Sequence, residues 1–213
     1  MAVDLETACN EAATRALQIE AGEALFDLDG TLIHGDIGES AVVVLDPPGW
    51  DWPAYHALVE SDDPAVRAAG ALTQALITAR ALAGLTVPEV ERIVDTAFAE
   101  GLVRPCEATC ALAHKLSLHH RVWILTGSAI VLGRAVAPRL GLQNVIGLLL
   151  SFDGDRLTDR VLPPVTIASG KINAAWVSTG RRPAFAIGDS PWDVPLLEHA
   201  RSRLGVGRIA GVV

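Results

Sequence analysis

The sequence predicts an α/β protein in which a parallel sheet is sandwiched between helices and a helical segment is inserted near the start. Short apolar runs alternate with helical segments over residues 104–213, which is typical of a parallel sheet with helices on both faces. Residues 36–103 instead contain a loop rich in proline and tryptophan, followed by alanine-rich segments with no clear strand. We therefore predict a core of residues 1–35 and 104–213 and a helical cap of residues 36–103.

Each expected element follows from the spacing of its apolar residues and from residues that favour helix ends. Asp62 or Asp63 can cap a helix that begins at Pro64, and Thr86 with Glu89 has the spacing of a capping box. The expected helices span residues 4–19, 64–80, 86–101, 105–119, 128–140, 169–179 and 191–200. The expected strands span residues 24–28, 121–125, 144–150, 156–162, 184–187 and 203–206, with a hairpin turn at Asp153-Gly154.

Composition and charge narrow the classes of function. The chain of 213 residues carries 25 acidic and 17 basic residues, a formal net charge of −8, which opposes binding to nucleic acid or to an anionic membrane surface. No apolar run approaches the roughly 18 residues of a membrane-spanning helix. Residues 1–22 do not read as a secretion signal, and 3 cysteines are too few for a disulfide framework. We expect a cytoplasmic protein whose partner is a small molecule, in an oligomeric state that the sequence leaves open.

Four clusters of polar residues follow predicted strands or begin a helix. They are Asp27-Leu28-Asp29-Gly30-Thr31, Thr126-Gly127-Ser128, Ser169-Gly170-Lys171, and Gly188-Asp189-Ser190 with Asp193. Ligands of open α/β sheets bind beyond the carboxyl ends of the strands, so we expect the clusters to meet there. Their residue types suit phosphoryl transfer, which needs a nucleophile, a proton shuttle and positive charge or donors around the transferred oxygens.

Asp27 and Asp29 form the centre of this predicted site. They are two residues apart, so they share one face of a strand, and Gly30 favours a turn that brings both to the strand end. One carboxylate of such a pair can attack phosphorus while the other transfers protons. Several acids would repel a phosphate unless a divalent cation lay between them, and Mg²⁺ prefers oxygen ligands. We expect Mg²⁺ on Asp27, Asp189 and the carbonyl of Asp29, with Asp193 orienting these ligands.

Thr126, Gly127 and Lys171 are the predicted phosphate contacts. The Thr126 hydroxyl and the amides of the turn at Gly127 suit phosphate oxygens at a helix start. Lys171 adds a mobile positive charge that can neutralise both the aspartates and the transferred group. Only 2 of the 17 basic residues are lysines. Because lysine is rare in this chain, its presence at this position favours a functional role over chance.

The order and placement of the four clusters resemble the haloacid-dehalogenase superfamily, most closely its phosphoserine-phosphatase-like branch. The resemblance covers nearly the whole chain, and the insert lies where that branch carries a helical cap. It implies a Rossmann-like core and a Mg²⁺-dependent phosphatase that hydrolyses a small phosphomonoester metabolite through an aspartyl-phosphate. It also implies Asp27 as the nucleophile and Asp29 as the acid and base. The alternatives are a phosphomutase or phosphotransferase on the same core, or a catalytically silent phosphate-binding protein.

Substrate contacts are expected near the entrance to the cap. His34 lies where the chain leaves for the cap. By the resemblance, Asp36 matches an acid that meets the substrate amine in phosphoserine phosphatases, and it is one methylene shorter than their glutamate. The resemblance also implies a cap arginine for a substrate carboxylate, for which the candidates are Arg67, Arg80 and Arg92. Aromatic residues that could border the cavity are Trp50, Trp52, Tyr55 and Trp192.

Overall fold

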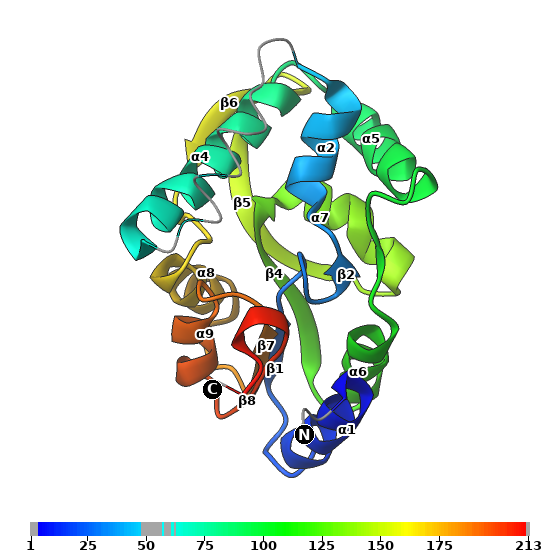
Figure 1. The fold of residues 1–213 in the computed structure, drawn as a ribbon, viewed down its shortest axis with the longest axis vertical. Helices are drawn as coiled ribbons and strands as arrows, with labels where there is room; N and C mark the ends of the chain where they lie inside the picture. Colours follow the sequence, from blue (N-terminus) through cyan, green and yellow to red (C-terminus); the bar gives the residue numbers. More distant parts are fainter. Residues whose placement is uncertain (1–3, 48–56, 58–60, 62, 212–213) are drawn as a thin grey trace.

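A six-stranded sheet forms the centre of the molecule (Figure 1). The structure is a computed structural model that describes residues 4–47, 57, 61 and 63–211, except the side chains of residues 64, 67 and 68. The strands are β1 (Glu23–Phe26), β4 (Arg121–Ala129), β5 (Asn144–Asp153), β6 (Arg156–Leu162), β7 (Phe185–Gly188) and β8 (Ser202–Gly205). Their order is β6-β5-β4-β1-β7-β8, and all neighbours are parallel except β5 and β6, which form the predicted hairpin. The predicted α/β class is confirmed.

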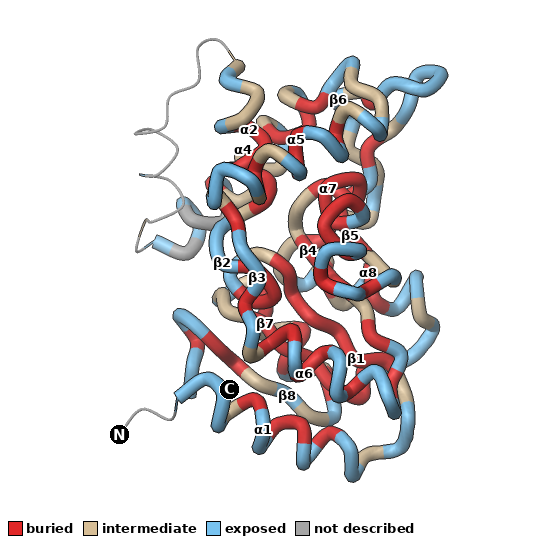
Figure 2. Tube along the Cα trace, turned by 90° about the vertical axis from the view of Figure 1, so that its right-hand side faces the viewer, coloured by how far each residue is buried: buried red, intermediate tan, exposed pale blue. Residues whose placement is uncertain are grey.

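Helices cover both faces of this sheet (Figure 1). Those on one face are α1 (Leu5–Ala16) and α6 (Glu107–Ser117), and those on the other are α8 (Ser169–Thr179) and α9 (Val194–His199). Apolar side chains of β1 alternate between the faces, because successive residues of a strand point in opposite directions. Ala24 and Phe26 pack into the core beside α1, and Leu25 packs into the core beside α8 and α9. All three are fully buried, and Figure 2 shows β1 as part of the buried interior.

The inserted segment contains the helices α2 (Ile37–Leu45), α4 (Pro64–Leu82) and α5 (Val87–Ala99). They lie between two short strands that pair antiparallel, β2 (Ile33–His34) and β3 (Arg104–Pro105), so the chain leaves and returns at neighbouring points. Figure 1 shows the three helices in the upper part of the molecule, at the level of β6, where α4 packs on β6 and α5 packs on α7 (Ile130–Val136). The division into core and cap stays a prediction. Within the described residues, no helix is long and apolar enough to cross a membrane.

The helices of the insert begin at residues that supply hydrogen-bond acceptors. Asp63 accepts the backbone N–H of Ala65 at 2.8 Å, and it is the N-cap of α4. Thr86 and Glu89 form the predicted capping box, with the Thr86 N–H donating to the Glu89 carboxylate at 2.8 Å. Asp36 caps α2 by accepting a backbone N–H of the first turn at 2.8 Å. Caps of this kind satisfy N–H groups that have no partner within the helix.

Strand β4 runs further than the sequence predicts. We expected a helix from Ser128, but β4 continues to Ala129 and α7 begins at Ile130. The pairing of β4 with β5 shifts register just before Ala129, and the Ser128 N–H donates to the Thr126 hydroxyl at 2.9 Å. The predicted helix start at Ser128 is therefore wrong, because this local hydrogen bond and the irregular strand pairing continue β4 through these residues.

His120 holds the end of α1 to the core and gives the fold a pH dependence. Its Nδ1 accepts the Gly22 N–H at 3.2 Å, so Nε2 carries the proton and donates to the Ala16 carbonyl at 3.0 Å. Burial lowers the pKa of His120 below its ordinary value of 6.5. The folded state therefore binds a proton less readily than the unfolded state, and its stability is complete above pH 6.5 and falls as the pH drops through the folded pKa.

We expect acidification from pH 7 to pH 5 to lower the free energy of unfolding by about 1 kcal/mol through His120, the size of one hydrogen bond. Urea unfolding at the two pH values measures the loss. His120→Gln is expected to reduce the pH dependence, whereas the control His34→Gln, which changes an exposed histidine, is expected to keep it. An unchanged pH dependence in His120→Gln would contradict the assignment.

Candidate active site

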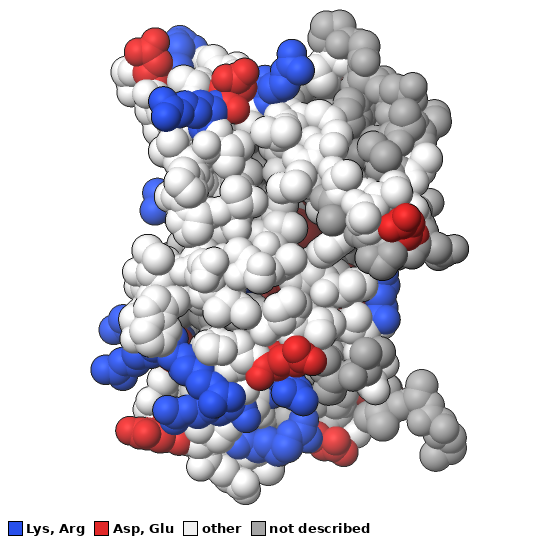
Figure 3. Space-filling view, turned by 90° about the vertical axis from the view of Figure 1, so that its left-hand side faces the viewer, with Lys and Arg blue, Asp and Glu red and all other residues white. Residues whose placement is uncertain are grey.

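A cavity of about 410 Å³ lies between the carboxyl edge of the sheet and the helices of the insert. In Figure 3, acidic side chains are visible in a hollow midway up the face, between the upper helices and the lower part of the molecule. Predicted site residues from all four clusters line the cavity, and these are Asp27, Asp29, Gly127, Lys171 and Asp189. The sheet thus brings together side chains that are far apart in the sequence, and the most distant two, Asp27 and Asp189, are separated by 162 residues.

Strand β1 delivers the two aspartates of the first cluster. The Asp27 N–H donates to the Ile187 carbonyl of β7 at 3.0 Å, which continues the sheet to this residue. Gly30 then has a φ of 75°, a conformation that favours glycine. A Cβ on Gly30 would lie 2.4 Å from Oδ2 of Asp189. Glycine at this position therefore permits both the turn and the close approach of the Asp189 carboxylate.

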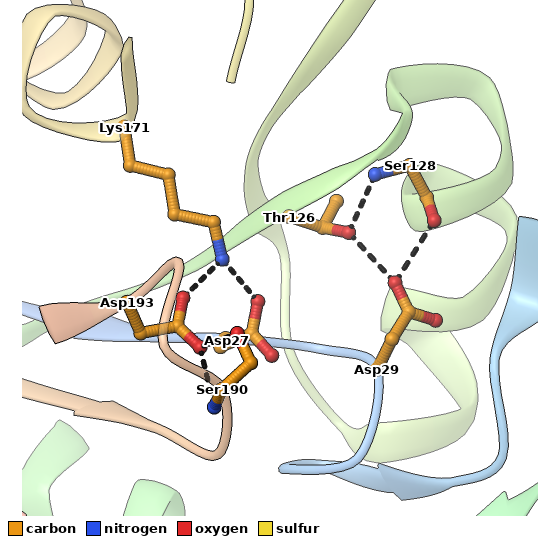
Figure 4. A network of polar contacts seen from close by, with 7 residues as sticks. All are labelled: Asp27, Asp29, Thr126, Ser128, Lys171, Ser190 and Asp193. Carbon is orange, nitrogen blue, oxygen red and sulfur yellow. Dashed lines mark hydrogen bonds and ion pairs between the residues drawn. The ribbon is translucent and has the colours of Figure 1, made fainter. Parts of the chain in front are cut away.

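Lys171 is enclosed by two carboxylates (Figure 4). Its Nζ lies 2.5 Å from Oδ1 of Asp27 and 2.5 Å from Oδ1 of Asp193, and all three side chains are buried. Burial alone would lower the pKa of the Lys171 ammonium, but the charges of Asp193 and Asp27 raise it above its ordinary value. The other oxygen of Asp193 accepts from the Ser190 N–H at 3.1 Å and the Ser190 hydroxyl at 2.8 Å. Asp193 thus fixes both the lysine and the loop that carries Asp189.

Asp29 belongs to a separate network (Figure 4). Its Oδ2 accepts from the Thr126 hydroxyl at 3.0 Å and the Ser128 hydroxyl at 2.9 Å, and its Oδ1 accepts the Ile37 N–H at 2.7 Å. Burial, followed by the charge of Asp36, raises the pKa of Asp29 to about 7. The carboxyl group is therefore held in one orientation and can both release and take up a proton near neutral pH.

The acidic cluster at the foot of the cavity fits a divalent cation. Carboxylate oxygens of Asp27, Asp189 and Asp193 all lie within 4.8 Å of one another. Three carboxylates and the one ammonium of Lys171 leave an excess of two negative charges. Burial, followed by the charge of Asp193, raises the pKa of Asp27 well above its ordinary value and that of Asp189 to about 6. A set of oxygen donors with excess negative charge suits Mg²⁺, although both oxygens of Asp193 are already used by Lys171 and Ser190.

Two predicted contacts have other partners in the structure. The Thr126 hydroxyl donates to Asp29, so its predicted contact with phosphate stays a prediction. Asp36 lines the cavity while it caps α2, and its Oδ2 accepts from Gln74 Nε2 at 2.9 Å. Burial raises the pKa of Asp36 above its ordinary value. Gly127 lies beside the carbonyl of Thr166 and lines the same cavity.

The remaining substrate candidates divide into those at the cavity and those away from it. Trp192 lines the cavity. His34, Arg80 and Arg92 are exposed and do not belong to the described lining. Arg92 instead lies 4.0 Å from Glu89 on its own helix. Of the other candidates, the Arg67 side chain and the residues Trp50, Trp52 and Tyr55 lie outside the described residues.

A family model described as haloacid dehalogenase-like hydrolase matches residues 24–198. The chain belongs to the haloacid dehalogenase-like hydrolase family. The match includes all four polar clusters, from Asp27 to Asp193. The superfamily expected from the order of these clusters is confirmed. No curated protein matches the chain.

Solved structures of this hydrolase fold are similar to the chain over most of its length. A protein of unknown function from Bordetella pertussis Tohama I is 20% identical with a TM-score of 0.64, covering 88% of this chain and 90% of that chain. A substrate-bound phosphoserine phosphatase is 15% identical with a TM-score of 0.62, covering 88% and 86%. A phospho-aspartyl intermediate analogue of phosphoserine phosphatase is 16% identical with a TM-score of 0.61, covering 88% and 87%. The haloacid dehalogenase-like hydrolase therefore has the fold of the predicted branch.

The structure of this haloacid dehalogenase-like hydrolase also reveals site residues that the sequence analysis did not single out. Gln74 and Thr78 of α4 and Arg208 near the end of the chain line the cavity, as does Ser190, which belongs to the fourth polar cluster but had no predicted role. Ser190 follows a predicted ligand directly, so its place in the cluster was a usable signal. Gln74, Thr78 and Arg208 lie in segments without a recognisable motif, and only the three-dimensional packing brings them to the cavity.

Proposed function

We propose that this chain is a Mg²⁺-dependent phosphatase that hydrolyses a small phosphomonoester through an aspartyl-phosphate on Asp27. One observation carries the proposal. Asp27 lies beside a buried ammonium and a cluster of acids, and it shares a cavity with Asp29, whose pKa is raised to about 7. A nucleophile, a proton carrier and charge compensation for a phosphate are thus present together.

In the first step, a carboxylate oxygen of Asp27 attacks phosphorus and the phosphorus–oxygen bond to the leaving group breaks. Asp29 gives its proton to the leaving oxygen, so the product is a neutral alcohol and the phosphoryl group is esterified to Asp27. The hydrogen bonds from Thr126, Ser128 and the Ile37 N–H stabilise the Asp29 carboxylate that results.

In the second step, Asp29 removes a proton from water, and the water oxygen attacks phosphorus. The bond between phosphorus and the Asp27 oxygen breaks, which releases inorganic phosphate and regenerates the Asp27 carboxylate. Asp29 is protonated again and ready for the next substrate. The same group therefore acts first as an acid and then as a base, which a pKa near the working pH permits.

The other predicted residues compensate charge around the phosphoryl group. Lys171 holds Asp27 in place and offers positive charge at the foot of the cavity, and the backbone at Gly127 lines the cavity where phosphate oxygens would lie. Mg²⁺ would be held by Asp27, Asp189 and the Asp29 carbonyl and would neutralise negative charge on the acids and the phosphate. Residues 36–103 would act as the cap that excludes bulk water from the core formed by residues 1–35 and 104–213.

Proteins of the same fold support this assignment. One of the similar phosphoserine phosphatase structures is a phospho-aspartyl intermediate analogue, and another contains substrate. By analogy, we assign the covalent intermediate of this chain to Asp27. The alcohol part of the substrate is not specified at this point. A small phosphorylated metabolite as substrate agrees with the expected cytoplasmic location.

The proposal predicts phosphate release that requires Mg²⁺. We expect the purified protein to release phosphate from at least one of a panel of amino-acid, sugar, polyol and choline phosphates, and from para-nitrophenyl phosphate. Removal of metal with EDTA should lower the rate at least 100-fold, because the acidic cluster then repels the substrate, and added Mg²⁺ should restore it. Colorimetric phosphate detection measures release, and ³¹P NMR distinguishes it from transfer to another hydroxyl. Equal rates with EDTA and with Mg²⁺ would exclude the metal-dependent mechanism.

A further inference from the structure

Thr78 offers a hydroxyl without a hydrogen-bond partner on the side of the cavity that the insert forms. The residue belongs to α4, is 4% exposed and lines the cavity. Within the described part of the chain, its hydroxyl makes no hydrogen bond, whereas the hydroxyl of Thr73 on the same helix donates to the Ala69 carbonyl at 2.7 Å. The hydroxyl is not fully enclosed, so it is accessible from the cavity and can donate to or accept from a ligand there.

Oxygen atoms from three elements converge beside Thr78. A Cβ on Gly38 of α2 would lie 3.1 Å from Asp36 Oδ1, 3.3 Å from Thr78 Oγ1 and 3.4 Å from Ser128 Oγ. Asp36, Gly38 and Ser128 line the same cavity as Thr78. The absence of a side chain at Gly38 therefore allows α2, α4 and the end of β4 to bring three polar groups together at one wall of the cavity.

This wall lies next to the group that would protonate the leaving oxygen. Ser128 donates to Asp29 at 2.9 Å, and the same Ser128 hydroxyl lies, like the Thr78 hydroxyl, within 3.4 Å of the point where a Cβ of Gly38 would be. The part of a substrate that reaches Thr78 is therefore the alcohol part close to the ester oxygen. The phosphoryl group itself would lie with Asp27 and Lys171.

We propose that Thr78 is a specificity-determining residue whose hydroxyl binds a free hydroxyl group of the substrate's alcohol part, close to the ester oxygen. The inference rests on the proposed phosphatase function. A substrate hydroxyl can accept the Thr78 proton and donate its own to Asp36 or Ser128, which satisfies every group at this wall. An ammonium group cannot accept that proton, and a hydrocarbon would leave all three oxygens without a new partner. Polyol and sugar monophosphates are therefore the favoured substrate class.

The test compares substrates that differ by one hydroxyl group. 1-Hydroxypropan-2-yl phosphate and isopropyl phosphate, or 2-hydroxyethyl phosphate and ethyl phosphate, form such pairs. We expect wild type to have a kcat/KM at least 10-fold higher for the hydroxylated member of a pair, since a site that binds a hydroxyl discriminates against the analogue that lacks it. In Thr78→Val this ratio should fall at least fivefold, while the melting temperature should change little because the Thr78 hydroxyl makes no hydrogen bond with the described residues that the substitution would remove.

Thr73→Val is the matched control, because it removes a hydroxyl from the same helix that has a partner and does not belong to the described cavity lining. It should keep the wild-type ratio. Equal kcat/KM values within both pairs for wild type, or an unchanged ratio in Thr78→Val, would overturn the role of Thr78 while the phosphatase function stands. The absence of phosphate release from every substrate, including para-nitrophenyl phosphate, would overturn the proposed function instead.

Discussion

Asp27→Asn is expected to lower phosphate release about 10⁴-fold or more, because loss of a covalent nucleophile removes the route through the intermediate. The structural change is small. An amide oxygen can still accept from the Lys171 ammonium, which lies 2.5 Å from Asp27 Oδ1. The amide nitrogen cannot attack phosphorus as a carboxylate oxygen does. If Asp27→Asn folds normally but loses activity, then Asp27 has a chemical role in the reaction and not only a structural one.

Covalent trapping makes this prediction specific for the nucleophile. Wild type incubated with a ³²P-labelled substrate and quenched in acid should retain label on the peptide that contains Asp27, and Asp27→Asn should retain none. Asp159→Asn is the control, since Asp159 is an exposed residue of β6. Phosphate release by Asp27→Asn within tenfold of wild type, confirmed with Asp27→Ala, would contradict the proposed mechanism.

The elements that the sequence predicts well have strong local signals. The apolar run before Asp27 predicts β1, because a strand buried on both faces is apolar throughout. Thr86 and Glu89 predict the start of α5 because the capping box uses side chains and backbone within one turn. The four polar clusters predict where the site lies because the carboxyl ends of parallel strands meet at one edge.

Other features depend on interactions that a local pattern does not contain. The extension of β4 to Ala129 depends on its pairing with β5. The hydrogen bond that the Thr126 hydroxyl donates goes to Asp29, which is 97 residues away in the sequence. Thr78 and Arg208 reach the cavity only through the packing of distant segments. The substrate side of the site is therefore harder to predict than the chemical side, because its residues follow the shape of the cavity and not a motif.

Lys171→Met is expected to lower the free energy of unfolding by about 3–5 kcal/mol, which is typical of breaking a buried ion pair by removing one partner. The ammonium is the cation that both Asp27 and Asp193 contact at 2.5 Å, and the three side chains are buried. Without it, two carboxylates remain close together without a counter-charge. Urea unfolding at pH 7 in EDTA measures the loss, since added Mg²⁺ would itself compensate charge at the acidic cluster.

The pH dependence identifies charge repulsion as the cause. In the variant, the folded-state pKa of Asp27 should rise further above its unfolded value, because the Lys171 charge that lowers it is lost, so the cost grows as the pH rises and shrinks towards pH 5. Lys115→Met is the matched control, because Lys115 is the other lysine of the chain and is exposed on α6, and it should change stability by less than about 0.5 kcal/mol. Adding Asp193→Asn to Lys171→Met should recover part of the loss by removing one of the two charges. If the free energy of unfolding of Lys171→Met instead lies within about 1 kcal/mol of the wild-type value at both pH values, then the buried lysine does not hold the acidic cluster together.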